Sequence, residues 1–467
     1  MGGGLLQLVA YGAQDVYLTG NPQITFFKVV YRRHTNFAVE AIQQTFSGTP
    51  GYGNTVTCQI SRNGDLINRV YLQVNLPKLD GISFTPAITA FSGPRYVNYI
   101  GLRLIKSVTI EIGGQQIDKH YSDWLYIWNE LSLPLGKRYA YDTMVGADKD
   151  LTFLKNTNLY IPLEFWFCRN VGLALPLIAL QYHEVKINIQ FENKEKCVIN
   201  LSTETGTADE TLTLTGGTIP AITDASLWVD YIFLDTDERR RFAQLSHEYL
   251  IEQLQFTGTE TLLAPTVASG IVNNRIKLNF NHPCKELVWV AKPSNHMKKS
   301  TWYNYTDTDI MDKTVSTLAN SPYNQNLATS NTLLTSNTFM IGSRQLPDAI
   351  NSSPFKDAIL QLNGNDRFSV REATYFSYVQ PYQHHTNIPS NAGIHVYSFA
   401  LKPEDHQPSG TLNMSRIDTA TLMVNVKANN TAASGTTYTT YEGINIYAVN
   451  YNVLRILSGM GGLAYSN

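Results

Sequence analysis

The sequence predicts an all-β protein in which one chain forms two similar β-sandwiches. It contains 27 Tyr and 19 Phe but only 8 Met, a balance that favours the half-buried surfaces of sheets over helical bundles. Many short runs rich in β-branched and aromatic residues are bounded by Gly, Pro, Asn or Asp, which is the pattern of strands between turns. The order of these runs in the first half recurs in the second, which indicates a duplicated unit.

The first half begins with an arm, residues 1–25, that mixes Gly, Asn and Pro with isolated apolar residues and has no core of its own. Its short apolar run lacks a preceding basic segment, so it does not read as a signal peptide, and Leu6 stands where a myristoylation motif needs Ser or Thr. Seven predicted strands follow: Ala38–Phe46, Thr55–Ile60, Leu66–Leu76, Leu102–Ile112, Leu159–Phe167, Glu184–Phe191 and Leu227–Leu234.

A change of pattern at DTDERRRFAQLSHEYLIEQLQ, from Asp235, marks the best boundary between the halves. Asp235 can cap a helix with Glu238 three residues on, and acidic residues precede Arg239, Arg240 and Arg241. The three arginines could form a phosphate-binding patch, but the neighbouring acids favour a solvated linker helix that neutralises its own charge.

In the second half, strands are predicted at Ile251–Thr257, Arg275–Phe280, Glu286–Ala291, Ala358–Leu362, His395–Leu401, Thr421–Val426 and Ile444–Leu457. Three segments pair with the first half in the same order. Val56–Leu76 matches Arg275–Ala291, and Glu184–Phe191 matches Thr421–Val426. The segment from Ile110 matches that from Leu360, because each has alternating apolar residues, a tight turn (Gly113–Gly114 or Asn363–Gly364) and then a polar segment entering a helix.

Two polar stretches, Asn200–Ser226 and Lys298–Ile350, have no strand pattern and few charges. Loops of this length in a compact domain are usually functional or disordered. The longer one holds Trp302, Tyr303, Tyr305, Tyr323, Leu333, Leu334, Phe339 and Met340, so we expect an ordered excursion that packs on itself or on a neighbouring chain.

Composition excludes several classes of protein. A net charge of -2 with 16% charged residues argues against a polybasic nucleic-acid binder, and no apolar stretch is long enough to span a membrane. Cys58, Cys168, Cys197 and Cys284 are too scattered for a disulfide scaffold or a zinc site, and we expect them to be reduced and buried.

Motif searches give no catalytic or cofactor site. Walker, GxSxG and HExxH patterns are absent from the sequence. The glycines Gly459, Gly461 and Gly462 end the chain without a helix to receive a phosphate. His247–Glu248 and His384–His385 are expected to be surface or satisfied residues, and Asp307, Asp309 and Asp312 lack the glycine and distal glutamate of a calcium loop. Five sequons, at Asn200, Asn304, Asn351, Asn413 and Asn429, are expected by chance. We therefore predict no enzymatic activity, no cofactor and no metal.

Four blocks of sequence resemble the major capsid proteins of the nucleocytoplasmic large DNA viruses. They are GGLLQLVAYGAQDVYLTGNPQITFFKVVYRRHTNFAVE (Gly3–Glu40), GQQIDKHYSDWLYIWNELSLP (Gly114–Pro134), FLDTDERRRFAQLSHEYLIEQ (Phe233–Gln253) and QPSGTLNMSRID (Gln407–Asp418). The resemblance covers most of the chain, and its first and last blocks are the most specific. Lys298–Ile350 matches no part of the family pattern, which leaves its place on a capsomer open.

The resemblance implies a double jelly roll, that is, two consecutive eight-stranded jelly-roll sandwiches with a short linker helix and long loops. Three chains would form a pseudo-hexagonal capsomer that tiles an icosahedral shell. The expected divisions are an arm (1–25), a first jelly roll (26–234), a linker helix (235–249) and a second jelly roll (250–467) with the long loop 298–350.

Partners implied by the resemblance are other copies of the chain, first in a homotrimer and then in neighbouring capsomers, together with minor capsid and penton proteins. We expect no direct nucleic-acid binding and no membrane span, although the shell can overlie an internal viral membrane. The protein would be assembled in the host cytoplasm and reside in the virion.

Two groups of residues are predicted to serve assembly. Apolar side chains of the arm would become buried between or beneath capsomers: Leu5, Leu6, Leu8, Val9, Tyr11, Val16, Tyr17 and Leu18. Asn413, Arg416 and Asp418 form a structural motif just before a predicted strand. The opposite charges of Arg416 and Asp418 could orient the preceding loop by an ion pair or by hydrogen bonds to the backbone, and the alternative is a solvated turn.

Two other functions remain open at this stage. A carbohydrate-binding or glycan-hydrolysing β-sandwich would use exposed aromatic residues and, if hydrolytic, paired carboxylates; Trp302 and Tyr303 near Asp307 are its best candidates. A scaffold or regulatory protein of the same fold would differ from a capsid protein by remaining monomeric.

Overall fold

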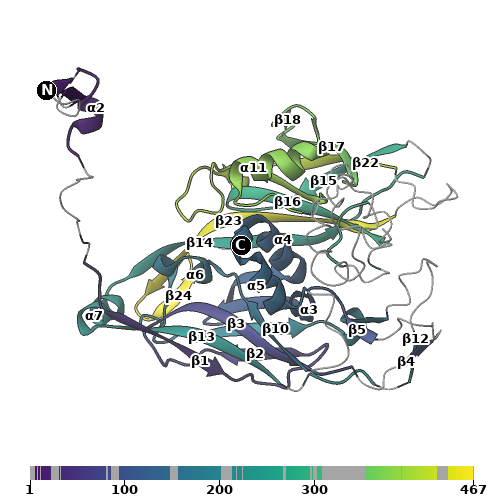
Figure 1. The fold of residues 1–467 in the computed structure, drawn as a ribbon, viewed down its shortest axis with the longest axis horizontal. Helices are drawn as coiled ribbons and strands as arrows, with labels where there is room; N and C mark the ends of the chain where they lie inside the picture. Colours follow the sequence, from purple (N-terminus) through teal and green to yellow (C-terminus); the bar gives the residue numbers. More distant parts are fainter. Residues whose placement is uncertain are drawn as a thin grey trace. The chain divides into compact units, whose positions relative to one another are not determined.

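The computed structural model describes most of the chain, and Figure 1 shows its ribbon. The described residues are 6–7, 9–10, 12–22, 31, 33–79, 83–85, 94–147, 156–200, 213–216, 218–222, 224–266, 270–294, 297, 302–307, 353–390, 392–428 and 440–465. The chain divides into two compact units, Met1–Phe37 and Ala38–Asn467. The first unit contains α2 (Val16–Thr19), and the second contains both β-sandwiches.

The first sandwich has two antiparallel sheets, ordered β1-β13-β3-β8 and β2-β10-β6-β7, with β9 (Leu175–Pro176) added beside β3. The bounds of the first sheet are β1 (Phe37–Gln44), β13 (Ala225–Leu234), β3 (Leu66–Leu76) and β8 (Thr157–Pro162). Those of the second are β2 (Thr55–Gln59), β10 (Val185–Phe191), β6 (Ile105–Ile112) and β7 (Gln115–Tyr121). Along the chain, the strands pass back and forth between the two sheets. This connectivity is that of a jelly roll.

The second sandwich repeats this order. Its sheets run β14-β23-β16-β20, with β21 beside β16, and β15-β22-β17-β18, with β19 also beside β17. The first sheet consists of β14 (His247–Glu260), β23 (Tyr441–Leu457), β16 (Pro283–Pro293), β20 (Ile394–Ser398), β21 (Leu412–Asn413) and β24 (Met460–Leu463). The second consists of β15 (Ile271–Leu278), β22 (Ala420–Lys427), β17 (Phe355–Leu362), β18 (Asn365–Asp366) and β19 (Arg371–Glu372). Each strand of the first sandwich therefore has a counterpart in the second, and the predicted double jelly roll is confirmed.

Corresponding hairpins explain why the sequence repeat was visible. Ile112 pairs with Gln115 across Gly113 and Gly114, and Leu362 pairs with Asn365 across Asn363 and Gly364. All four turn residues have positive φ, as a two-residue turn with φ > 0 at both positions requires. The turns predicted at these positions are therefore confirmed.

Apolar side chains alternate along the strands and fill each sandwich. In β10, every second residue from Val185 to Phe191 is buried, the period expected of a strand with one face on a core. The central strand β16 is instead buried along almost its whole length. Leu287, Trp289 and Ala291 belong to the core of the second roll. Val288 and Val290 join the core of the first roll, so this sheet is covered on both faces.

Helices occupy the connections between strands. Figure 1 shows α4 (Ser122–Ser132), α5 (Leu135–Val145), α3 (Ile100–Leu104) and α6 (Trp166–Arg169) between the two rolls of the second unit. In the chain, α7 (Thr236–Gln244) lies between β13 of the first roll and β14 of the second roll. The side chain of Asp235, which precedes this helix, accepts a hydrogen bond from the Thr236 amide. No described helix is long and apolar enough to cross a membrane.

Several element predictions need correction. The strand predicted at Leu159–Phe167 ends at Pro162 and is followed by α6, because proline cannot donate to a sheet ladder. The strand predicted from Leu102 starts at Ile105, after α3. In the first polar stretch, Thr213–Gly216 forms a strand, β12, that pairs with β4 (Ser83–Thr85). A second small pair joins β5 (Pro94–Tyr96) to β11 (Val198–Asn200).

All four cysteines are free, as expected, but Cys168 is only partly buried, whereas Cys58, Cys197 and Cys284 are buried. Burial raises the pKa of the Cys58 thiol to about 12, so this thiol is protonated at neutral pH and unreactive.

Candidate functional site

Helix α4 joins the first roll to the second. Every residue from Ser122 to Leu131 is buried, since one side of the helix meets its own roll and the other meets the sheet β14-β23-β16-β20. The Trp124 ring lies 5.5 Å from the Tyr447 ring of β23, and the Ser122 hydroxyl lies 2.6 Å from the Tyr303 hydroxyl. The two rolls are thus fixed against each other by a core and not by a linker alone.

Asp123 on α4 is the polar centre of this contact. Its carboxylate pairs with the Lys292 ammonium of β16 and accepts a hydrogen bond from the Tyr305 hydroxyl at 3.1 Å. Burial acts to raise the pKa of Asp123, but Lys292 and Tyr305 outweigh burial and hold it below its usual value. A carboxylate this deeply buried is stable only with such partners.

A second ion cluster links α6 to the second roll. Glu252 on β14 contacts the Arg169 guanidinium at 3.0 Å and the Lys285 ammonium at 2.5 Å. The Lys285 side chain is fully buried, and Arg169 also lies over the Trp128 ring of α4, 4.0 Å from its centroid. Both cations are therefore committed to structural contacts.

The side chain of His385 is fully buried between two carboxylates. One ring nitrogen lies 2.9 Å from Glu286 and the other 2.9 Å from Glu404. Burial by itself lowers the pKa of His385, but the two carboxylates raise it to about 9. The imidazolium is thus the stable form at neutral pH. The sequence predicted that His385 is a surface or a satisfied histidine, and in the structure it is a satisfied one, although nothing in the local sequence marks its distant partner Glu286.

Residues just after His385 form hydrogen bonds with the first roll. The Asn387 amide donates to the Leu131 carbonyl at 2.9 Å, and the Ser390 hydroxyl donates to Glu130 at 2.9 Å. Glu130 also pairs with Arg138 of α5. The protonated His385 therefore lies at the start of a loop whose hydrogen bonds connect the second roll to the first.

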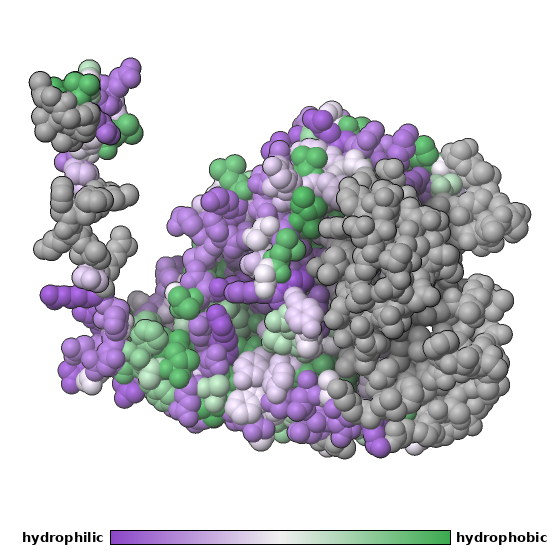
Figure 2. Space-filling view, in the orientation of Figure 1, coloured by the Kyte–Doolittle hydropathy of each residue, from purple (hydrophilic) through white to green (hydrophobic). Residues whose placement is uncertain are grey.

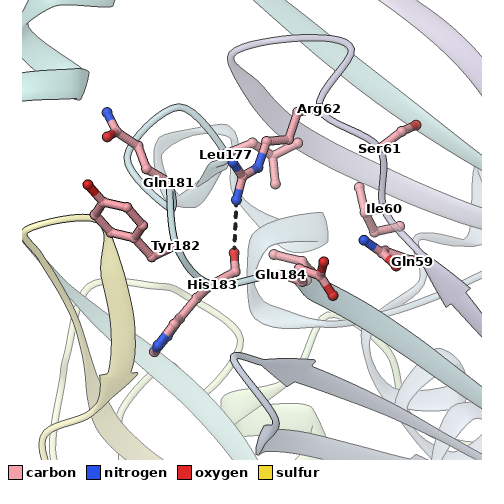
Figure 3. Close-up of a pocket in the computed structure, with 10 residues that line it drawn as sticks. Gln59, Ile60, Ser61, Arg62, Leu177, Gln181, Tyr182, His183 and Glu184 are labelled. Atoms are coloured by element: carbon pink, nitrogen blue, oxygen red, sulfur yellow. Dashed lines mark hydrogen bonds between the residues drawn. The ribbon is translucent and has the colours of Figure 1, made fainter.

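A surface cavity of about 360 Å³ lies at the first roll (Figure 3). Its lining joins the loop after β2 to the loop before β10: Gln59, Ile60, Ser61, Arg62, Leu177, Gln181, Tyr182, His183, Glu184 and Val185. Arg62 donates to the carbonyls of Leu180 and His183, so its charge is used in holding the loop. No nucleophile and base lie within hydrogen-bond reach of each other in this lining, as covalent catalysis would require.

The C-terminal glycines serve close packing. A Cβ at Gly461 would lie 2.6 Å from Leu180 of the first roll, and Gly459 has φ +82°. The β23–β24 hairpin can dock beside His183, whose ring lies 2.8 Å from the Gly461 carbonyl, because these positions carry no side chain.

Other candidate residues have ordinary partners. The His247 ring bonds the Phe242 carbonyl and the His384 ring bonds the Leu401 carbonyl. Asp307 pairs with Lys427 at 3.3 Å, while Asp309 and Asp312 lie outside the described residues. Within the described part of the chain, no three His, Cys, Asp or Glu side chains are grouped to hold a metal.

The aromatic pair considered for glycan binding is not available. Tyr303 is buried, and Trp302 packs under the Arg103 guanidinium, 4.1 Å from the ring centroid. The Trp302 indole N–H also donates to the Lys196 carbonyl at 3.0 Å. Both rings therefore belong to the packing of the first roll.

The predicted assembly residues are exposed where they are described. Leu6, Val9, Val16, Tyr17 and Leu18 all present large exposed surfaces. Leu5, Leu8 and Tyr11 lie outside the described residues.

In the other predicted motif, Asn413 accepts a hydrogen bond from the Ser415 amide at 3.0 Å and caps a short helical turn. Arg416 and Asp418 are exposed, and no ion pair joins them within the described chain. Their effect on the loop stays a prediction.

A row of partly exposed aromatic residues was not identified from the sequence. Tyr71 and Trp228 face each other on β3 and β13, their rings stacked at 6.3 Å, and Tyr160 of β8 lies 6.4 Å from Tyr71. The sequence signal that could have identified this row is the alternation of buried and partly exposed residues along the strand, since Tyr71 lies between the buried residues Val70 and Leu72. Figure 2 shows that much of the visible surface is polar, with apolar residues in small separate groups.

Two similar jelly rolls in one chain, packed against each other through the buried helix α4, define the class of double jelly-roll proteins. A family model described as "Major capsid protein N-terminus" matches residues 25–235, and one described as "Large eukaryotic DNA virus major capsid protein" matches residues 238–462. The chain belongs to this family of major capsid proteins.

Relatives match over full length. The chain is 47% identical to the major capsid protein of Phaeocystis pouchetii virus and 44% identical to that of Paramecium bursaria Chlorella virus 1, covering 100% of both chains in each case. Among solved structures, it matches the quasi-atomic model of the PBCV-1 virus capsid with a TM-score of 0.72 and 40% identity, over 95% of this chain and 100% of the other. The chain is a major capsid protein of a large DNA virus and forms the capsid shell of the virion.

Proposed function

We propose that the protein acts as a homotrimeric, pseudo-hexagonal capsomer that tiles an icosahedral shell. The observation that carries this proposal is the identical strand order of the two rolls and their rigid union through α4. One chain then presents two similar blocks in a fixed relation, and three chains provide the six blocks of a hexagonal tile. The likeness to the PBCV-1 capsid model supports the same arrangement.

The divisions expected from the sequence are arm 1–25, first roll 26–234, linker helix 235–249 and second roll 250–467. The last boundary moves to His247 in this proposal, because α7 ends at Gln244 and β14 of the second roll begins at His247. The two family models meet between residues 235 and 238, which supports a boundary at α7. In this proposal the protein is not an enzyme, and it contacts neighbouring capsomers, minor capsid proteins and penton proteins without binding nucleic acid. Assembly takes place in the host cytoplasm, around an internal membrane where the virus has one.

The arm and the 413–418 motif have separate proposed roles. The exposed apolar residues of the arm become buried between or beneath capsomers, which offsets the entropy lost when the arm orders. Arg416 and Asp418 hold the loop before β22 in the conformation that assembly needs.

Light scattering on the purified protein tests the capsomer directly. A trimer has about three times the single-chain mass of 52.3 kDa, and electron microscopy should show hexagonal particles. A stable monomer at micromolar concentration contradicts the proposal and favours a scaffold protein of the same fold.

A further inference from the structure

A lysine, an asparagine and an aspartate meet in the buried contact between α4 and the second roll. The Lys292 ammonium lies 2.5 Å from Oδ2 of Asp123. The side-chain amide of Asn445 donates to the same oxygen at 3.4 Å. One carboxylate oxygen therefore contacts both the amine of a lysine and the amide nitrogen of an asparagine. These are the two nitrogens between which protons must move when a lysine displaces ammonia from an asparagine.

Strand register brings Lys292 and Asn445 together on one sheet face. Val290 of β16 pairs with Asn445 of β23, and Lys292 pairs with Gly443. Lys292 and Asn445 are thus diagonal neighbours on the face that α4 covers, and a long side chain can cross such a diagonal. Gly443, directly opposite Lys292, places no side chain between them. The lysine side chain can therefore reach Asn445 along the sheet.

The amide of Asn445 is held in one orientation. Its Oδ1 accepts a hydrogen bond from the Thr259 hydroxyl of β14 at 2.7 Å, and its Nδ2 also donates to the Tyr447 hydroxyl at 3.1 Å. A hydroxyl donor on the amide oxygen stabilises the negative charge that develops there when a nucleophile adds to the carbonyl carbon. The nitrogen, which is the leaving group of such a reaction, faces the Asp123 carboxylate.

The surroundings of this site are largely closed to water. Asn445 is 2% exposed, and the neighbouring Tyr305 and Tyr447 are fully buried. Burial stabilises charges less well than water does, so transfer of a proton from Lys292 to Asp123, which gives an uncharged amine and an uncharged acid, costs less here than at a surface. The uncharged amine is the nucleophilic form of lysine.

We propose that Lys292 and Asn445 join through an isopeptide bond, with Asp123 as the group that carries the protons. The ion pair is the state before the reaction. A proton passes from Nζ to the carboxylate, and the free amine adds to Cγ of Asn445 while the Thr259 hydroxyl holds the negative charge on Oδ1. Asp123 then protonates Nδ2 and takes a second proton from Nζ, the Cγ–Nδ2 bond breaks, and ammonia leaves. The products are one amide, one ammonia molecule and an uncharged Asp123 carboxyl, so atoms and charge balance.

The bond links two strands of one sheet at the same end. β16 ends at Pro293, just after Lys292, and β23 begins at Tyr441, just before Asn445. A covalent link at this place restricts the unfolded chain, as a disulfide does. It also replaces a buried ion pair by uncharged groups, which removes a cost of desolvation. Each chain reacts once with itself, so the reaction is a self-modification without turnover.

Mass spectrometry of the purified full-length protein tests the proposal. Under denaturing conditions, the mass of the wild type should be lower than the calculated mass by one ammonia molecule. Digestion should give a branched peptide that joins Lys292 to Asn445. Asn63 and Asn363, each followed by glycine, can also lose ammonia by cyclising, so the branched peptide is the decisive observation.

Three variants separate the roles of the residues. Lys292→Arg keeps a cation beside Asp123 but has no nucleophilic amine, and Asn445→Ala removes the carbon that is attacked. Both should lack the branched peptide and melt at a lower temperature than the wild type. Asn425→Ala is the matched control and should keep the branched peptide, because Asn425 of β22 also donates its amide to a carboxylate, that of Asp357 at 2.5 Å.

The wild-type measurement decides the proposal even if a variant does not fold. If folded wild-type protein gives separate peptides containing unmodified Lys292 and Asn445, before and after prolonged incubation, the proposal is wrong and the ion pair is the final state. If the branched peptide is present in Asp123→Asn as well, Asp123 is not the proton carrier.

Discussion

The guanidinium of Arg239 on α7 forms a two-point ion pair with the carboxylate of Asp65, the residue just before β3. Nε lies 3.0 Å from Oδ1 and Nη2 donates to Oδ2 at 3.0 Å. Asp65 also accepts the Leu234 amide at 2.9 Å. One carboxylate thereby ties the end of β13 and the following helix to the first roll.

Arg239→Ala should lower the free energy of unfolding by about 1 kcal/mol, because a bidentate pair is stronger than an ordinary surface pair but Arg239 is half-exposed and screened by solvent. Urea unfolding measures this change. Arg240→Ala, at an exposed arginine of the same helix, is the control and should change little. Equal effects of the two substitutions would show that the pair with Asp65 adds nothing.

Lys292→Met should destabilise the protein by roughly 3–5 kcal/mol, because it leaves the buried Asp123 carboxylate without its cation. Adding Asp123→Asn to this variant should recover part of the loss, since the neutral amide can still meet Tyr305. Thermal and urea unfolding of the single and double variants test the coupling. Simple additivity of the two substitutions would mean that Asp123 and Lys292 do not depend on each other.

The pH dependence of stability should report His385. Its folded pKa is raised to about 9 from the unfolded value of 6.5, so the folded state binds the extra proton between these pH values. The stabilisation is complete below about pH 6.5 and is lost as pH rises through 9, amounting to about 3 kcal/mol. His385→Gln should remove this loss. Unfolding free energies from pH 6 to 10 test it, and an unchanged slope in the variant would exclude His385 as the source.

Much of the fold was predictable because its signals are local. The residue types at Gly113–Gly114 and Asn363–Gly364 predict tight turns, because glycine and asparagine tolerate positive φ. The alternation of apolar and polar residues in strands such as Val185–Phe191 predicts which face of the strand is buried. The duplication could be detected because both rolls keep these signals in the same order.

The contacts between the rolls were not predictable in the same way. Asp123 and Lys292 are 169 residues apart, and His385 meets Glu286 from a distant strand. Nothing in a short window distinguishes such a pair from two solvated charges. The aromatic row formed by Tyr71, Trp228 and Tyr160 was missed for a related reason, because partly buried aromatic residues in a strand look alike whether they face a core, solvent or another chain.

Arg416→Ala and Asp418→Ala should weaken trimer formation or lower the melting temperature of the trimer by more than one degree, if these residues orient the loop before β22. Asn413 already caps this turn, so a correctly placed loop needs little further support in the isolated chain, and we expect the larger effect on assembly. Light scattering and thermal melting measure both properties. Variants that melt within a degree of wild type and still trimerise would favour a solvated turn.

Deletion of residues 2–23 should block shell assembly while leaving trimer mass and melting temperature nearly unchanged. The arm lies in the first compact unit, Met1–Phe37, and its described apolar side chains are exposed. Ordering such a segment costs roughly 1 kcal/mol or more per residue, so it must bury apolar surface on a neighbour at about 25 cal/mol per Å². A full-length variant with Ser in place of Leu6, Val9, Val16, Tyr17 and Leu18 keeps the arm but removes its apolar contacts. This variant should show the same assembly defect as the deletion, with electron microscopy as the measurement. A deletion that abolished trimers or unfolded the first roll would instead make the arm part of the fold.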